Sequence, residues 1–549
     1  MTICTATHTH AHPSKGVAAG VHARPSIINF RRFRPGGTNP RTWTSVPTWS
    51  LIILALVFTS CSRKPDPTTL VVIIESSPTN LDPRVGLDAW SQNIDGLLFD
   101  NLLARDEHLS VKPGLAEGWE TPDPKTYIFH LHKNVKFSDG RPLTSRDVKW
   151  SYDSLIEGKI RSAKGATYRS VEKIETLDDN TVIFHLKVPW AALLWNLAAP
   201  GMGIVPYGSS LEVSRNPIGS GPFRFVSAEQ DKEVVIERNH NYWGEKAKID
   251  RVRFAVIPDT TTRALELRKG SADLEINALA SDMEAALERE PRLNIRRRPG
   301  TRLGYMAFNL RDPILKDVRV RQAIAYAIHR QPLIHYLMRD SARPAASVLP
   351  PESWAYDANV RQYPHDPAKA RRLLDSAGYI VTNGVRFHLT MKTSTEESSR
   401  AMAAVFQQQL REVGIALDIR SFESATFFSD VTHGEFQVYS LRWLGANEDP
   451  DIFEYAFDTA RIIPNGANRQ YYSNTRVDAL IEKARTEVDQ NARKQDYAAI
   501  QEILAQDLPY INLWYFDNVM VYSKRVHGLE LNPSGNYDFL RRAELDSSR

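Results

Sequence analysis

A short continuous run of apolar residues follows the N-terminal segment, at residues 70–74 (Leu-Val-Val-Ile-Ile). Such a run is typical of a strand that is buried on both faces of a sheet. Turn-forming residues follow at 76–80 and predict the end of this strand. Further apolar residues recur at helical spacing and predict an amphipathic helix over 88–105; they are Ile94, Leu97, Leu98 and Leu102.

Two later segments alternate apolar and polar residues, as strands with one buried face do. Their apolar positions are Tyr127, Phe129 and Leu131 in the first segment, and Val182, Phe184, Leu186 and Val188 in the second. We expect these segments to be neighbouring strands of one antiparallel sheet. Between them, Thr144 and Asp147 have the spacing of a capping box and predict the start of a helix.

From about residue 234 the pattern changes to alternating strands and helices. A strand is expected at 252–257, followed by a helix that begins at Asp259 or Thr260 and stops at Gly270. Further strands are expected at 416–422, 436–443 and 510–515, and further helices near 396–413, 475–488 and 491–507. This alternation predicts an α/β protein whose strands are parallel in part.

Two further helices have recognisable ends. Alternating small and branched apolar residues at 323–328 predict a helix that Pro332 interrupts. The order Asp366, Pro367 predicts a helix start, and Gly378 predicts its end.

Composition excludes several classes of protein. The chain has 549 residues, of which 42% are hydrophobic and 24% charged, which is the profile of a globular protein of about three domains. Six basic residues and no acidic ones lie in residues 1–60, so the remainder carries 63 basic residues against 65 acidic ones. A near-neutral body does not favour nucleic-acid binding.

The N-terminal segment has the features of an export signal. Residues 51–58 (LIILALVF) are too few to cross a bilayer, which takes about 20 residues, but they fit the apolar region of a signal peptide. The sequence Thr59-Ser60-Cys61-Ser62 follows and resembles a bacterial lipobox, in which the cysteine is lipidated and becomes the first mature residue. We therefore predict a cleaved signal over 1–60 and a lipidated tether over 61–69. The alternative is that Cys61 only ends a signal that is cleaved elsewhere. Since Cys4 is the only other cysteine, the mature chain would contain no disulfide.

Eight segments together resemble a known family, and the resemblance covers essentially residues 69–525. These segments are NLDP at 80–83, FDNLL at 99–103, KNVKFSDGRPLTSRDVKWSYDSL at 133–155, NPIGSGPFRF at 216–225, NYWG at 241–244, DVRVRQAIAYAIHR at 317–330, DP at 449–450 and YSNTRVDALIEKA at 472–484. In this order they are similar to the extracellular solute-binding proteins of ABC importers that include dipeptide-, oligopeptide- and nickel-binding members.

The resemblance implies a two-lobed fold of the periplasmic-binding-protein type, with a hinge and an extra β-rich subdomain. The first lobe would comprise 70–105, the subdomain 106–214 and a second part of the first lobe 215–302. The second lobe would comprise 303–505, and 506–549 would return to the first lobe. The chain crossings are expected near 300–309 and 506–514.

The resemblance also implies a ligand site between the lobes, formed by the strips 76–79 and 442–447 and by residues near the hinge. The expected ligand-binding residues are Ser77, Thr79, Tyr305, Asn309, Arg442, Trp443, Gly445, Asn447 and Asp449. Each has a structural alternative: a post-strand turn for Ser77 and Thr79, hinge backbone contacts for Tyr305 and Asn309, an ion pair for Arg442, core packing for Trp443 and a helix cap for Asp449.

One position departs from the peptide-binding members of the family. Those members have an aspartate that pairs with the peptide's α-ammonium, and Ala446 stands at that position here. Asn447, Glu448 or Asp449 would have to replace it, or the ligand differs.

The resemblance implies that the protein captures peptides and delivers them to an ABC permease, without a cofactor and as a monomer. Oligosaccharide or nickel-chelate binding and ligand sensing are the alternatives, and a secreted hydrolase is a remote one. The sequence contains no G-x-S-x-G or H-E-x-x-H motif, and no Cys/His cluster with metal-ligand spacing lies in the mature chain. We therefore expect neither catalysis nor a bound metal, and no nucleic-acid partner.

Overall fold

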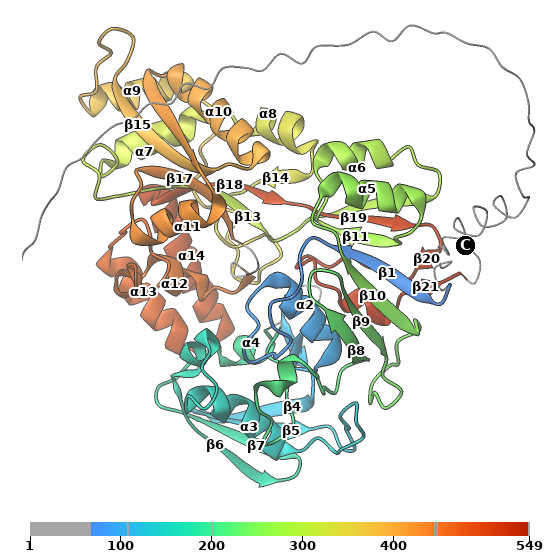
Figure 1. The fold of residues 1–549 in the computed structure, drawn as a ribbon. Coiled ribbons are helices and arrows are strands. Elements are labelled where there is room, and N and C mark those ends of the chain that lie inside the picture. The colour runs from blue at the N-terminus through green and yellow to red at the C-terminus, as the bar shows by residue number, and fades with distance from the viewer. Residues whose placement is uncertain (1–66, 107–108, 200, 444, 446–447, 547–549) are drawn as a thin grey trace, which may run out of the picture. The chain divides into compact units, whose positions relative to one another are not determined.

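The computed structural model describes residues 67–546, except for 107–108, 200, 444 and 446–447. The predicted signal segment and Cys61 lie outside the described residues. Within the described part, two large β-sheets and a smaller one organise the chain (Figure 1). No helix in this part is long and apolar enough to cross a membrane.

The first sheet has seven strands in the order β12-β19-β11-β1-β10-β9-β8. Strand β1 (Thr69–Ile74) lies in its centre with all six residues buried, as its apolar run predicts. It pairs in parallel with β10 (Arg251–Val256) and β11 (Leu274–Ile276). The other strands are β8 (Phe223–Glu229), β9 (Glu233–Arg238), β12 (Leu293–Arg298) and β19 (Asn518–Ser523). We call the part built on this sheet the first lobe.

Helices cover both faces of this sheet. Helices α5 (Thr260–Lys269) and α6 (Ser281–Leu287) pack on one face. Helix α2 (Ala89–Leu98) and the C-terminal segment pack on the other. The predicted ends of α5 are confirmed, because the Asp259 carboxylate accepts from the Thr262 backbone N–H and Gly270 ends the helix with φ 82°.

The second sheet has six strands in the order β14-β18-β13-β17-β15-β16, and we call the part built on it the second lobe. Its strands are β13 (Leu303–Phe308), β14 (Ala342–Pro344), β15 (Phe387–Ser394), β16 (Ile415–Phe422), β17 (Val438–Trp443) and β18 (Tyr510–Phe516). Strand β15 is parallel to both β16 and β17, which confirms the partly parallel organisation.

Helices also cover both faces of the second sheet. One face carries α7 (Val318–Ala327), α9 (Pro367–Ser376) and α10 (Glu397–Arg411). The other carries α11 (Ser424–His433), α12 (Ile452–Phe457), α13 (Thr475–Thr486) and α14 (Gln490–Asp507).

A four-stranded antiparallel sheet in the order β4-β5-β7-β6 forms a β-rich subdomain with its own core. Its strands are β4 (Ala116–Asp123), β5 (Thr126–Leu131), β6 (Val171–Asp178) and β7 (Thr181–Leu186). The predicted pairing of β5 with β7 is confirmed. Helix α3 (Ser145–Ile156) begins at the predicted capping box, where Asp147 accepts from the Thr144 backbone N–H at 2.7 Å. The short helix α4 (Leu193–Leu197) also belongs to this region.

Three sequence-based expectations were wrong in extent. The helix expected over 88–105 ends at Leu98, because residues 103–105 pair as β2 (Leu103–Arg105) with β3 (Val111–Pro113). Val188 lies beyond the end of β7 and is 52% exposed. Pro332 does not interrupt α7, which ends at Ala327; it ends the short helix α8 (Arg330–Pro332), which leads into a π-helical turn (Leu333–Leu337).

The chain passes between the two large sheets twice. It leaves β12 and enters β13 across residues 299–302, at the start of the range expected for the first crossing. It leaves β18 and enters β19 at Asp517, three residues beyond the range expected for the return. Strand β18 therefore belongs to the sheet of the second lobe.

A buried ion pair ties the first lobe to its subdomain. Arg84 and Asp82 are both 0% exposed, and the Arg84 guanidinium donates to the two carboxylate oxygens of Asp82 at 2.9 and 2.7 Å. Its remaining donors reach the backbone oxygens of Ser209 and Ser210 at 3.2 and 3.0 Å. One arginine thus fixes the loop before α2 against the end of the subdomain.

We expect Arg84→Met to lower the free energy of unfolding by about 3–5 kcal/mol, because Asp82 would lose the guanidinium that bonds both of its buried carboxylate oxygens. Arg141→Met is the matched control, since Arg141 bonds Asp139 at the same two-residue spacing but is 54% exposed. The control should change stability by at most about 1 kcal/mol. Urea unfolding of the three proteins measures both values, and equal losses would contradict the structural role of Arg84.

Candidate functional site

The loop expected to face the ligand begins where β17 ends at Trp443 and leads to α12. Trp443 is 8% exposed, and its ring stacks on that of Tyr305 with the centroids 5.8 Å apart. The indole N–H donates to the Tyr510 hydroxyl at 3.3 Å. The structure therefore brings together two of the residues singled out from the sequence, Trp443 and Tyr305.

Tyr305 is the centre of this group of rings. It is 1% exposed and lies on β13, with the rings of Tyr510 and Tyr439 at 4.7 and 6.0 Å. Its neighbour Trp443 also contacts the ring of Tyr455 at 6.3 Å. We call Tyr305, Tyr439, Trp443, Tyr455 and Tyr510 the aromatic cluster. Tyr305 and Trp443 are both buried in this structure. Their contact with a ligand stays a prediction.

Arg469 adds a charge to this cluster. Its guanidinium carbon lies 5.6 Å from the ring of Trp443 and 5.5 Å from that of Phe428, and Nη1 donates to the Tyr305 hydroxyl at 3.4 Å. Neither Arg469 nor Phe428 was predicted as a site residue, since no local sequence pattern indicates a binding role for either. Phe428 is 48% exposed and Tyr455 is 46% exposed, so the group reaches the surface.

Glu448 connects the same loop to the first lobe. It is 3% exposed and accepts from Arg105 Nη1 at 3.0 Å and from the hydroxyl of Thr301 at 2.7 Å. The Arg105 guanidinium in turn lies 3.9 Å from the ring of Trp195. Glu448 therefore holds a loop of the second lobe against β2 and against the first chain crossing.

Asp449 lies next to this contact. Burial, together with the nearby carboxylate of Asp451, raises the pKa of Asp449 to about 7. One of its oxygens accepts from the backbone N–H of Asp451 at 2.7 Å, which orders the turn before α12. This contact is a turn bond and not the helix cap of the structural alternative, because the N-cap of α12 is Asp451.

Arg442 points away from the aromatic cluster, since successive residues of a strand face opposite sides of the sheet. Its side chain is exposed, lies 5.6 Å from the ring of Phe516 and makes no ion pair with the described residues. Gly445 is exposed and has φ 77°, a conformation that favours glycine. Asn447, like Ala446, lies outside the described residues.

The remaining predicted site residues hold loops together. The Ser77 hydroxyl accepts from the Asp231 backbone N–H at 2.8 Å. Thr79 donates its hydroxyl to Asp88, the residue that caps α2. Asn309 donates its amide to the backbone oxygens of Gly434 and Phe436 at 3.2 and 2.9 Å. Asn309 thus bonds the connection between α11 and β17 and not the hinge backbone of its structural alternative, and ligand binding by the three residues stays a prediction.

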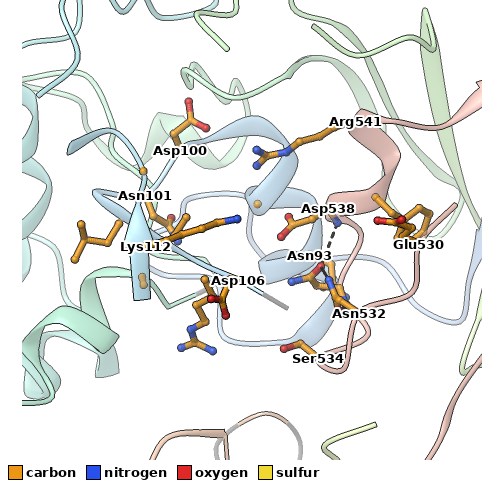
Figure 2. Close-up of a pocket in the computed structure, with 18 of the residues that line it drawn as sticks. Asn93, Asp100, Asn101, Asp106, Lys112, Glu530, Asn532, Ser534, Asp538 and Arg541 are labelled. Atoms are coloured by element: carbon orange, nitrogen blue, oxygen red, sulfur yellow. Dashed lines mark hydrogen bonds between the residues drawn. The ribbon is translucent and has the colours of Figure 1, made fainter. Parts of the chain in front are cut away.

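A pocket of about 840 Å³ lies between the first lobe and its subdomain, lined by α2, the β2–β3 pair with Arg105, and residues 530–542 (Figure 2). Its lining includes Lys112, Asp538 and Arg541, and none of its residues comes from the second lobe. Arg541 donates to the Tyr242 hydroxyl at 3.4 Å, and its Nε is buried without a hydrogen-bond partner. This pocket was not predictable from the sequence, because its walls come from segments far apart in the chain.

Asp100 forms a buried polar centre in the wall of this pocket. It accepts from the indole N–H of Trp243 at 2.8 Å and from the Ser220 hydroxyl at 3.1 Å, while burial raises its pKa. In the described part of the chain, no group of three or more His, Cys, Asp or Glu residues is placed to hold a metal ion.

Known proteins resemble this chain over most of its length. A model of the bacterial extracellular solute-binding proteins, family 5, matches residues 110–465. The di/tripeptide-binding protein 1 of Pseudomonas aeruginosa (strain UCBPP-PA14) is 29% identical over 513 residues, which cover 86% of this chain and 93% of that protein.

Two solved structures extend the comparison. The oligopeptide-binding protein AppA from Bacillus subtilis, in complex with a nonapeptide, has a TM-score of 0.74 and 26% identity, and the match covers 87% of this chain and 99% of that chain. NikZ from Campylobacter jejuni, in complex with Ni(L-His), has a TM-score of 0.75 and 25% identity with the same coverage. These neighbours confirm the two-lobed α/β fold expected from the sequence. The family match spans more than half of the sequence and includes the subdomain and most of the second lobe, and the chain therefore belongs to the bacterial extracellular solute-binding proteins of family 5.

Proposed function

We propose that the protein captures peptides outside the cytoplasm and delivers them to the permease of an ABC importer. The observation that carries this proposal is the pair of lobes joined by two chain crossings, with the loop after Trp443 reaching from one lobe to the other through Glu448. The similarity to a di/tripeptide-binding protein and to a structure with a bound nonapeptide supports peptides as the solute.

Hinge closure is the mechanism that this arrangement supports. A solute drives two lobes together only if it binds the closed form more tightly than the open one. Glu448 contributes to the closed form, because it bonds Arg105 of the first lobe and Thr301 at the crossing. The permease would then recognise the closed shape.

The ligand site in this proposal lies at the loop that follows β17. Trp443 and Tyr305 would supply an apolar wall, and the backbone at Gly445 and Asn447 would bond the peptide main chain, as in strand-addition binding. Asp449 would contribute charge only in part near neutral pH, because its pKa is raised to about 7.

We further propose that Cys61 carries a lipid anchor and that residues 61–69 tether a monomeric binding domain to the membrane, on the periplasmic or outer face. The lipobox-like sequence at 59–62 supports this proposal. Mass spectrometry of the membrane-extracted protein would detect an acylated N-terminal cysteine; an unmodified Cys61 would contradict it.

A non-peptide solute is the second candidate. The sequence has Ala446 where peptide-binding members carry an aspartate, and a structural neighbour holds Ni(L-His). A metal would then arrive as a chelate and be recognised through its organic part.

We expect peptides of two to five residues to raise the melting temperature of the purified protein, because a ligand that binds only the folded state stabilises it by about 2.7 kcal/mol at a concentration of 100 Kd. Native mass spectrometry should also find a co-purified peptide. Oligosaccharide and metal-chelate pools are the controls. Stabilisation by a sugar or a chelate alone would replace the peptide proposal with the second candidate.

We expect Glu448→Gln to weaken binding of the best peptide about tenfold, which corresponds to about 1.4 kcal/mol, because the closed form loses its buried ion pair with Arg105. Small-angle X-ray scattering should show a larger radius of gyration for this variant. Arg339→Ala is the matched control, since Arg339 also pairs across the lobes, with Asp282, but both side chains are more than half exposed. Unchanged affinity and dimensions in Glu448→Gln would show that Glu448 does not support closure.

A further inference from the structure

Arg469 has a guanidinium that lies among aromatic rings, and none of the described acidic residues pairs with it. It makes no ion pair with any described residue, and its Nε is buried without a hydrogen-bond partner. Its hydrogen-bond partners are tyrosine hydroxyls, that of Tyr305 at 3.4 Å and that of Tyr439, and the rings of Trp443 and Phe428 lie beside it.

The tyrosines cannot supply the missing negative charge. Burial raises the pKa of Tyr305, and that of Tyr439 lies well above its usual value, so both hydroxyls stay neutral at physiological pH. A guanidinium has five N–H donors, which suit two parallel hydrogen bonds to a carboxylate. Arg469 therefore keeps a charge that no described carboxylate balances and a buried Nε donor that the described residues do not satisfy.

Other arginines with an unpartnered buried Nε are satisfied elsewhere. Arg105, Arg238, Arg343 and Arg485 each pair with a carboxylate. Arg302 donates to two oxygen acceptors at 2.9 Å. Arg541 resembles Arg469 in bonding a tyrosine hydroxyl, but it lies in the field of Asp538 and Asp100. Among these arginines, Arg469 alone has neither a carboxylate nor a backbone oxygen close by.

Two of the rings around Arg469 reach solvent, and the helix that carries one of them is linked to the β-rich subdomain. Phe428 and Tyr455 are each about half exposed, at 48% and 46%. Tyr455 belongs to α12, and Arg485, which pairs with Asp451 and Glu454 at the start of that helix, accepts at its backbone oxygen from the Ala191 N–H of the subdomain at 2.9 Å. A solute held between the lobes could thus reach the guanidinium.

We propose that Arg469 binds a carboxylate of the captured solute, while the rings of Trp443 and Phe428 contact the group that carries it. The inference rests on the proposed function and narrows it to a class of ligand, namely solutes with at least one free carboxylate. For a peptide, this carboxylate is either the C-terminal one or an acidic side chain. The carboxylate of the solute supplies the negative charge that the described residues around Arg469 do not provide. The partly apolar surroundings strengthen this ion pair.

The test compares matched peptides by isothermal titration calorimetry. The probes are peptides of two to five residues with a free C-terminal carboxyl, the same peptides as C-terminal amides, and amides that contain one Glu. We expect the wild type to bind the free acids or the Glu-containing amides about 10- to 100-fold more tightly than the plain amides. Arg469→Met should remove this preference, and Arg469→Lys should keep part of it.

Arg361→Met is the control variant. Arg361 also lies over an aromatic ring, that of Tyr363 at 5.5 Å, but on an exposed part of the second lobe. It should retain the wild-type preference. The comparison of acids with amides in the wild type needs no variant, so a misfolded Arg469→Met would not prevent the test.

Failure of the inference and failure of the proposed function give different results. Equal binding of acids and amides by the wild type overturns the role of Arg469 and leaves peptide capture standing. Binding of a non-peptide carboxylate, weakened by Arg469→Met, overturns peptide capture and supports the inference. A co-purified solute that has no carboxylate overturns both.

Discussion

The double crossing between the two large sheets is the constraint on which the rest of the structure depends. Arg302 lies in the first crossing, and one of its nitrogens donates to the Asn277 amide oxygen and to the backbone oxygen of Asp517 in the second crossing, both at 2.9 Å. Burial, and then the charge of Arg442, lower the pKa of Arg302 to about 10, so it stays charged at neutral pH. One side chain thus holds the two crossing segments side by side, and motion of the lobes must pivot about them.

The position of Glu448 follows from this constraint. Its partner Thr301 is the residue before Arg302, so the loop after Trp443 is attached directly to the pivot. Its other partner, Arg105, belongs to the strand that leads into the β-rich subdomain. A change in this loop on ligand binding would therefore act on the hinge and on the first lobe together, without a long chain of intermediate contacts.

The sequence predicts the elements whose cause is local. The run at 70–74, the capping box at Thr144 and the glycine stop at Gly270 depend on neighbouring residues, and each is found where expected. The extent of α2 was not predictable in this way, because residues 103–105 leave the helical pattern to pair with β3. The site was less predictable still. Trp443 and Tyr305 were predicted as site residues from the family resemblance. Arg469 contacts them only through the tertiary structure of the second lobe, so no local sequence pattern predicts it.

Other buried arginines in the described part of this chain either pair with a carboxylate or donate to backbone oxygens. Arg525 pairs with Asp273 through two bonds of 2.7 Å, and Arg321 donates to the backbone oxygens of four residues. Both solutions offset the cost of removing a cation from water. Arg469 has neither, although a carboxylate placed beside it by sequence change would stabilise the fold. A protein whose described residues leave this charge without a carboxylate keeps a binding site at the expense of stability, which is the pattern expected of a functional residue.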